Sequence, residues 1–336
     1  MPDLERRAFI ATSAAFLARP AVAQTSPWQA VADHARSLDQ CHALMILQNG
    51  STVLSERFRG PALGRAVPIK SVSKSIVAAL TGTALARGEI ASLDITLGET
   101  APELIPSGAD PEVAAITIRN LITMQAGLER TSGANYGSWV SSGNWVADAL
   151  SRPMVAKPGA GMLYSTGTTH VLGAVLSQVS GESLLSLARS RLGQPLGIDI
   201  PAWTRDPQGR YLGGNEMALT LSAMARFGEL YRNDGRIGNT QVLSEAWVRA
   251  SFQPATRSVF SGLGYGYGWF LGRAGQTDYA LARGYGGQII CVFPDLALTL
   301  ALTSDPTRPA RSAGYFGDLL ALIDQTIIPV ARSQQS

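Results

Sequence analysis

The sequence predicts a mixed α/β fold of the α+β type, in which an antiparallel five-stranded sheet is flanked by helices and carries an inserted, mostly helical lobe. Two strand-like runs lie near the N-terminus and three near the C-terminus, and the long region between them reads mainly as helices. Neither group of strands makes a stable sheet alone, so we expect the two groups to pair with each other. A ligand site is then expected in the cleft between the two lobes.

The N-terminal part of the predicted domain is one helix followed by a β-hairpin. Residues 28–38 show an amphipathic helical pattern, and residues 42–47 and 52–58 are strand-like runs joined through Asn49-Gly50. Asn-Gly between two such runs is the strongest short-range hairpin signal. A helix is then expected from Ser71 to about Arg87, where Gly88 ends it.

The middle and C-terminal parts contain the remaining elements. Helical patterns cover residues 116–124, 168–179, 184–192 and 220–233, while residues 129–145 are rich in Gly, Ser, Asn and aromatic residues and are expected to form a functional loop. Strands are expected at residues 265–271, 289–293 and 296–303, before a closing helix over 313–330.

Composition describes a core-forming globular protein. Of 336 residues, 46% are hydrophobic and 16% charged, and the net charge of +3 comes without a basic block, so no nucleic-acid partner is expected. His34, His42 and His170 are scattered, and we expect no metal or other cofactor. Cys41 and Cys291 could form a disulfide in an exported chain, or could both be buried free thiols.

Residues 1–23 resemble a twin-arginine signal peptide, which predicts a periplasmic or otherwise exported protein. Arg6-Arg7 precedes a short apolar run, and Ala21-Val22-Ala23 forms a cleavage site before Gln24. The alternative is a cytoplasmic protein with a frayed N-terminus. Residues 24–336 are then one domain, with a sheet lobe over about 28–70 and 255–332 and a helical lobe over about 71–254; no membrane span is expected in it. The sequence does not indicate an oligomeric state.

Ser71 and Lys74 form a candidate nucleophile and base. They are three residues apart, so on a helix they share one face, and Ser71 lies where the helix N-terminus favours developing negative charge. A lysine amine can accept the serine proton when burial lowers its pKa. The alternative is that Ser71 only caps the helix.

Several further motifs share the order and spacing of one known family. The chain resembles the serine β-lactamase / penicillin-recognising superfamily over about residues 40–325, and within it the class C-like carboxylesterases and 6-aminohexanoate-dimer hydrolase-like enzymes. The resemblance rests on the following segments: Ser71-Val72-Ser73-Lys74-Ser75, residues 116–128, Pro158-Gly159 before Tyr164-Ser165, Pro195-Leu196-Gly197-Ile198, residues 221–228 and Gly286-Gly287-Gln288.

The resemblance implies a role for each motif. Ser71 would be the acylated nucleophile, Lys74 its proton acceptor and Tyr164 the second acid/base, although Tyr164 could also be a core tyrosine. The backbone N–H groups of Ser71 and Gln288 would form the oxyanion hole. The segment Tyr285-Gly286-Gly287 corresponds to the family's Lys-Thr-Gly strand, where it would contact substrate; a glycine bulge without a ligand is the alternative.

Two departures from the family pattern affect the predicted substrate. Tyr285 stands where β-lactamases and peptidoglycan enzymes have a lysine that holds a carboxylate, and Thr166 stands where asparagine is common. Both changes favour a less charged ester or amide. Tyr136 and Asn215 are further candidate substrate contacts, although an ordinary packed loop would equally explain Tyr136.

These observations predict a serine hydrolase that cleaves ester or linear amide bonds of a small-molecule substrate through an acyl-enzyme. A penicillin-binding-type D-Ala carboxypeptidase or a weak β-lactamase is the alternative of the same class. A non-catalytic envelope binding protein on the same fold is the alternative of another class. A Ser-His-Asp hydrolase is disfavoured, because the chain has no G-x-S-x-G motif.

Overall fold

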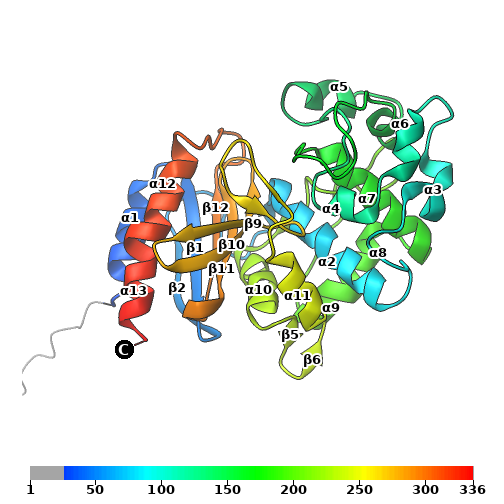
Figure 1. Ribbon diagram of the computed structural model, residues 1–336. Coiled ribbons are helices and arrows are strands. Elements are labelled where there is room, and N and C mark those ends of the chain that lie inside the picture. The colour runs from blue at the N-terminus through cyan, green and yellow to red at the C-terminus, as the bar shows by residue number, and fades with distance from the viewer. Residues whose placement is uncertain (1–25, 336) are drawn as a thin grey trace, which may run out of the picture.

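The computed structural model describes residues 26–335, so the predicted signal segment lies outside the described residues. Its centre is an eight-stranded antiparallel sheet with the strand order β2-β1-β12-β11-β10-β9-β8-β7 (Figure 1). The strands are β1 (Cys41–Gln48), β2 (Ser51–Arg57), β7 (Thr256–Arg257), β8 (Gly264–Tyr265), β9 (Phe270–Ala274), β10 (Thr277–Gly284), β11 (Gln288–Phe293) and β12 (Leu298–Ser304).

The predicted pairing of N-terminal with C-terminal strands is confirmed, because β1 lies between β2 and β12. The predicted number of five strands is wrong. The run 265–271 is interrupted at Gly268, whose φ of +79° turns the chain, so it forms β8 and β9 instead of one strand. Residues 279–282 belong to β10, and the two-residue β7 adds an edge strand.

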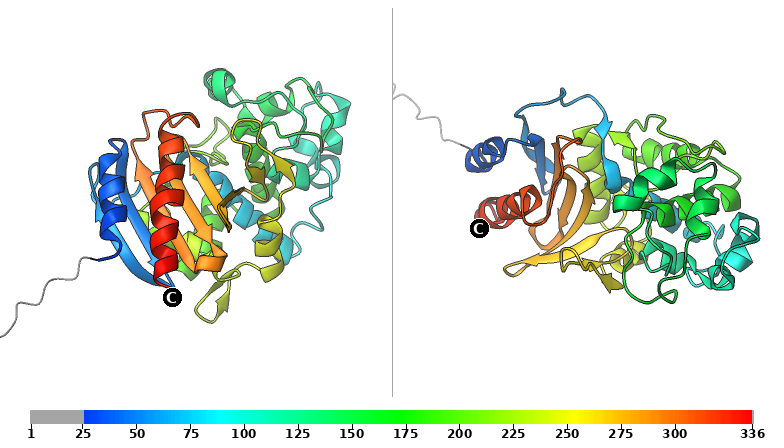
Figure 2. Two further views of the ribbon diagram at one scale, coloured as in Figure 1. Left: turned by 60° about the vertical axis from the view of Figure 1, so that its left-hand side comes forward. Right: turned by 90° about the horizontal axis from the view of Figure 1, so that it is seen from above.

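Helices cover both faces of the sheet, which explains why every residue of β11 is buried. Ile289 and Cys291 point to the layer of α1 (Gln29–Ser37), α12 (Tyr315–Leu322) and α13 (Ile328–Ser333), while Ile290 and Val292 point to α10 (Leu221–Arg232). This alternation follows from the two-residue period of a strand. Figures 1 and 2 show α1, α12 and α13 together on the outer face, away from the helical lobe.

The helical lobe is built around α2 (Ser73–Ala86) and α7 (Thr166–Ser180), which are almost wholly buried. Around them lie α3 (Leu97–Thr100), α4 (Ile118–Ile122), α5 (Tyr136–Val140), α6 (Trp145–Leu150), α8 (Leu184–Ala188), α9 (Gln194–Leu196) and α11 (Glu245–Ser251), with the two-stranded pairs β3 (Val67–Pro68)–β4 (Ala218–Leu219) and β5 (Arg236–Ile237)–β6 (Thr240–Gln241). The expected loop over 129–145 is wrong in part, because it contains α5 and the start of α6, packed through Trp139 and Trp145.

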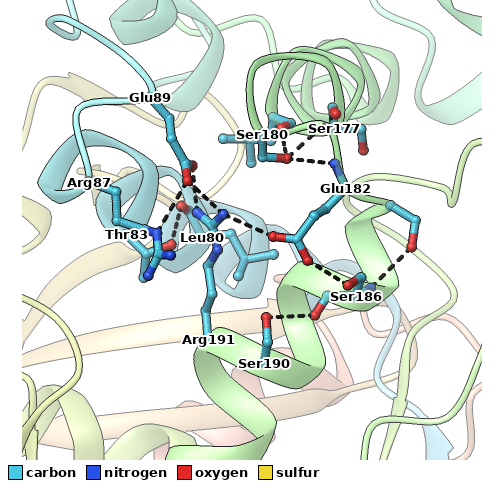
Figure 3. Close-up of polar contacts among 12 residues, drawn as sticks. Leu80, Thr83, Arg87, Glu89, Ser177, Ser180, Glu182, Ser186, Ser190 and Arg191 are labelled. Carbon is cyan, nitrogen blue, oxygen red and sulfur yellow. Dashed lines mark hydrogen bonds and ion pairs between the residues drawn. The ribbon is translucent and has the colours of Figure 1, made fainter.

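A polar cluster joins the end of α2 to the region of α8 (Figure 3). The guanidinium of Arg191 donates to both carboxylate oxygens of Glu89 at 2.6 and 2.8 Å, and lies 3.5 Å from Glu182. The Arg191 side chain is buried, and its bidentate contact with Glu89 restricts the relative orientation of the two side chains. The cluster therefore fixes the packing of α2 against the neighbouring helices.

Cys41 on β1 and Cys291 on β11 are both buried and free, with β12 between their strands. The structure thus has the free-thiol arrangement rather than the disulfide. Within residues 26–335, no single helix is long and apolar enough to cross a membrane; one bent pair, Thr166–Ser180 with Leu184–Leu196, meets the length and composition test only jointly, at an angle of 85°.

Candidate active site

Ser71 lies in a single 3-10 turn, Lys70–Val72, that leads directly into α2. The residues that precede both helices, Ile69 and Val72, make no side-chain cap, and Ser71 caps neither helix. Lys70 has a φ of +52°, which is rare for a residue with a side chain. The capping interpretation of Ser71 is therefore wrong, and its hydroxyl is a hydrogen-bond partner of Lys74 instead.

Lys74 is a buried amine that has no carboxylate partner among residues 26–335. Its Nζ lies 3.2 Å from the Oγ of Ser71, 3.2 Å from the Oγ1 of Thr166 and 2.6 Å from the carbonyl oxygen of Gly214. Burial lowers the pKa of Lys74 to about 7, since desolvation disfavours the charged form. Near neutral pH a large fraction of the amine is therefore unprotonated and able to accept a proton.

Tyr164 lies two residues before α7, with the Nζ of Lys74 5.1 Å from its ring centroid. Its ring stacks on Phe270 at 5.9 Å and meets the edge of Tyr265 at 6.4 Å. Burial raises the pKa of Tyr164 to about 12, against the opposing effects of a hydrogen bond with Ser71 and the positive charge of Arg283. The phenol is thus protonated at neutral pH and next to both other groups.

Thr166, expected to contact substrate, instead supports Lys74. Its hydroxyl lies between the Nζ of Lys74 and the Oγ of Ser132, 3.1 Å away, and its backbone N–H donates to the same Ser132 oxygen at 2.9 Å. The start of α7 is thereby fixed to the loop that carries Ser132. Thr166 is not among the residues that line the pocket described below.

The segment 213–217 runs beside the turn that carries Ser71. The carbonyl of Gly214 accepts from Lys74, and Gly214 has a φ of +85°, where a Cβ atom would lie 3.1 Å from the Cγ of Lys74. The side-chain amide of Asn215 donates to the Tyr136 hydroxyl at 2.8 Å. Tyr136 and Asn215 therefore pair with each other, and neither lines the pocket described below.

Residues 285–287 form the turn between β10 and β11, so the expectation that they are a strand is wrong. Gly286 and Gly287 have φ values of +81° and +94°, which a strand does not have. Gln288 begins β11, and its fully buried side-chain amide bonds to the backbone of Ser304 at 2.8 and 3.1 Å. Gly286, Gly287 and Gln288 are not among the pocket's lining residues.

Ser71 and Tyr164 open into a pocket of about 450 Å³. Gly284 brings β10 against the segment that leads into the Ser71 turn, because a Cβ there would lie only 2.3 Å from the carbonyl oxygen of Ile69. The next residue, Tyr285, is 53% exposed. The lining residues are Ser71, Tyr164, Ser258, Phe260, Phe270, Arg283, Gly284, Tyr285, Ala310, Arg311 and Ser312.

Sequence reasoning missed Arg283, Arg311 and the aromatic walls Phe260 and Phe270. No motif marks them, because each reads as an ordinary strand or loop residue; only the position of Arg283 at the start of the glycine-rich segment Gly284-Tyr285-Gly286-Gly287 could have indicated it. Among residues 26–335, no three His, Cys, Asp or Glu side chains gather where they could hold a metal ion.

Comparison with known proteins defines the class. The Beta-lactamase family model matches residues 34–324, and the chain belongs to that family. Esterase EstB of Burkholderia gladioli is 33% identical over 144 residues, which cover 39% of this chain and only 36% of that protein.

Solved structures share the fold. A protein of Bacillus anthracis classed as a candidate 6-aminohexanoate-dimer hydrolase is 17% identical with a TM-score of 0.74, over 91% of this chain and 81% of that one. EstCE1, described as a hydrolase with promiscuous acyltransferase activity, is 19% identical with a TM-score of 0.69, over 82% of this chain and 93% of that one.

Proposed function

We propose that this protein is a serine hydrolase that cleaves ester or linear amide bonds through an acyl-enzyme on Ser71. The observation that carries the proposal is the 3.2 Å contact between the buried amine of Lys74 and the hydroxyl of Ser71, a residue that lines a pocket large enough for a small molecule. The similarity to an esterase and the family membership support it.

Acylation follows from the protonation states of the three groups. Neutral Lys74 accepts the proton of Ser71 as its Oγ bonds to the substrate carbonyl carbon, whose π electrons move to oxygen. When the tetrahedral intermediate collapses, the bond to the leaving group breaks, and the Tyr164 phenol supplies its proton. The proton held by Lys74 then returns to the phenolate, which restores both groups and leaves an ester on Ser71.

Deacylation repeats these steps with water. The Tyr164 phenol passes its proton to neutral Lys74 as it takes a proton from a water molecule, whose oxygen attacks the acyl carbon while the carbonyl π electrons move to oxygen. Collapse of the second tetrahedral intermediate breaks the bond to Oγ, and the proton returns to Ser71. The product is the free acid, and no group of the protein is consumed.

For the oxyanion hole we propose the backbone N–H groups of Ser71 and Tyr285 in place of the Ser71 and Gln288 pair expected from sequence. Tyr285 lines the pocket, and its neighbour Gly284 packs against the residues that precede Ser71. Gln288 lies three residues further on, outside the lining. Two N–H donors that face the developing negative charge stabilise the transition state, and such stabilisation is usually the largest single contribution to the rate enhancement.

The test is turnover of 4-nitrophenyl acetate and butyrate and of nitrocefin by the wild type, Ser71→Ala and Ser73→Ala. Ser73 is a matched control, because its hydroxyl is engaged with the carbonyl of Lys70 at 2.6 Å. We expect ester turnover that Ser71→Ala abolishes, and an acyl adduct on Ser71 by mass spectrometry. Nitrocefin turnover above ester turnover would favour a β-lactamase; ligand binding without cleavage of either substrate would favour the non-catalytic alternative.

A further inference from the structure

Arg283 is a cation in the pocket without a counter-ion. One guanidinium N–H donates to the carbonyl of Ala310 at 2.7 Å, and the group lies 3.4 Å from the ring centroid of Phe316. A guanidinium has five N–H donors, and among the residues described here no carboxylate pairs with this one. An unpaired, partly buried charge costs stability, so its presence calls for a partner that is absent from the chain itself.

The register of the sheet places Arg283 on the face of β10 that borders the pocket. Leu281 pairs with Phe270, and Arg283 lies on the same face of β10 two residues further on, toward the end where Ser71 and Tyr164 lie. Its positive charge acts on Tyr164 and lowers the pKa of that phenol. Burial lowers the pKa of Arg283 to about 10, so the guanidinium stays charged at neutral pH.

The rest of the pocket strengthens this positive character. Arg311 lines the same pocket, no lining residue is acidic, and Ser258 and Ser312 offer hydroxyl groups. Phe260 and Phe270 provide apolar surface between the polar groups. The pocket therefore combines apolar walls with a cationic region beside the nucleophile.

We propose that Arg283, assisted by Arg311, binds a carboxylate of the substrate, so that the preferred substrates are esters or amides with a free acid group. This inference rests on the proposed function and names its substrate class. It reverses the expectation of a less charged substrate, which rests on Tyr285 in place of the family's lysine and on Thr166 in place of asparagine. The cation comes instead from a strand residue two positions before Tyr285, and a planar guanidinium can hold a carboxylate by two parallel hydrogen bonds.

The experiment compares pairs of esters that differ only in this charge. Mono(4-nitrophenyl) adipate and its methyl ester carry the group on the acyl side; 4-acetoxybenzoate and its methyl ester carry it on the leaving-group side. The variants are Arg283→Gln, Arg311→Gln and the control Arg273→Gln, an exposed arginine paired with Asp278 and outside this pocket. Enzyme-free rates are subtracted for every ester.

We expect the wild type to prefer the charged member of at least one pair by tenfold or more in kcat/KM. Arg283→Gln should remove most of this preference, Arg311→Gln part of it, and Arg273→Gln none. Rising ionic strength should weaken the preference in the wild type. A wild type that shows no preference for the charged ester would overturn the proposal. The proposal would also fail if Arg283→Gln lowered kcat/KM equally for both members of a pair, because Arg283 would then act only on Tyr164 and not on the substrate carboxylate.

The proposed function can fail separately. If no ester is turned over, the hydrolase assignment fails, and calorimetric titration with adipate still tests the anion site. Binding that weakens at least tenfold in Arg283→Gln or in Arg311→Gln would support the site. Unchanged binding in both variants, or no adipate binding by the wild type, would refute it.

Discussion

The amine of Lys74 lies 2.6 Å from the carbonyl oxygen of Gly214, closer than to the hydroxyl groups of Ser71 and Thr166, each 3.2 Å away. A carbonyl only accepts, so one amine hydrogen points to Gly214 in either protonation state. Another can point to Thr166. In the neutral amine this leaves the lone pair free to face Ser71, and the following predictions depend on that arrangement.

The rate should depend on the ionisation of Lys74. Its pKa is about 7 because of burial, and only the neutral form accepts the Ser71 proton. We expect kcat/KM for 4-nitrophenyl butyrate to rise with pH and level off above an apparent pKa near 7, and Lys74→Ala to reduce kcat by roughly 10³-fold or more. A flat profile between pH 6 and 9, or a folded Lys74→Ala variant with near wild-type kcat, would contradict this role.

The same shift predicts how stability varies with pH. Lys74 has a folded-state pKa of about 7, below its ordinary value of 10.5, so between these pH values the unfolded chain binds more protons and stability rises with pH. In Lys74→Met this contribution is absent. In urea unfolding experiments, the free energy of unfolding should increase more between pH 7 and pH 9 for the wild type than for Lys74→Met. Equal increases would refute a neutral buried amine.

Tyr164 should matter through its proton. Burial holds its pKa at about 12, so it is a protonated donor at neutral pH rather than a preformed phenolate. Tyr164→Phe should lower kcat by roughly 10²–10⁴-fold while leaving the melting temperature nearly unchanged. Tyr265→Phe is the matched control, since that buried tyrosine packs against Tyr164 and has no assigned proton transfer. Equal effects of both changes would reduce Tyr164 to a packing residue.

Thr166 should act through Lys74. Its hydroxyl accepts from the lysine nitrogen, which favours the charged amine, so Thr166→Val should move the rising limb of the pH–rate profile to lower pH. We also expect a loss of roughly fivefold in kcat, because one hydrogen bond of about 1 kcal/mol that orients the base is removed. Thr166→Ser should restore both. If the pH–rate profile of Thr166→Val were the same as that of the wild type, Thr166 would have no effect on the pKa of Lys74.

Arg191 should affect stability and not catalysis. Arg191→Gln removes two charge-assisted hydrogen bonds from Glu89, which keeps its ion pair with Arg87, and should cost on the order of 2 kcal/mol in the free energy of unfolding. Hydrogen bonds from Arg191 hold the pKa of Glu89 below 4.5, so this stabilisation exists above that pH and is lost as the pH falls. The difference between variant and wild type should therefore shrink in acid, and kcat per folded molecule should stay unchanged.

Local patterns are sufficient for much of the fold and for the pairing of Ser71 with Lys74, whereas Tyr164 joins them only through the family resemblance. The Asn49-Gly50 hairpin and the helix beginning near Ser71 depend on neighbouring residues, and their signals are strong. The split of residues 265–271 into two strands depends on backbone conformation at Gly268, which the alternation of side chains does not reveal.

The supporting groups of the site were less accessible to sequence reasoning. The acceptor on Gly214 is a backbone carbonyl, and every residue has one. The place of Thr166 in the tyrosine motif predicts a substrate contact, because the sequence does not show its hydrogen bonds to Lys74 and Ser132. Arg283 carries no motif, and its meaning depends on the absence of a carboxylate near it in three dimensions.

The pairing of β1 with β12 has a consequence for how the chain matures. Ala43 pairs with Thr303 on the neighbouring strand, so residues from opposite ends of the polypeptide must meet before β1 has both of its neighbouring strands. Contacts this distant in sequence slow the search for the native state. During synthesis, β1 lacks its β12 partner until almost the whole chain has left the ribosome. A chaperone would therefore help most while this edge of β1 is still unpaired.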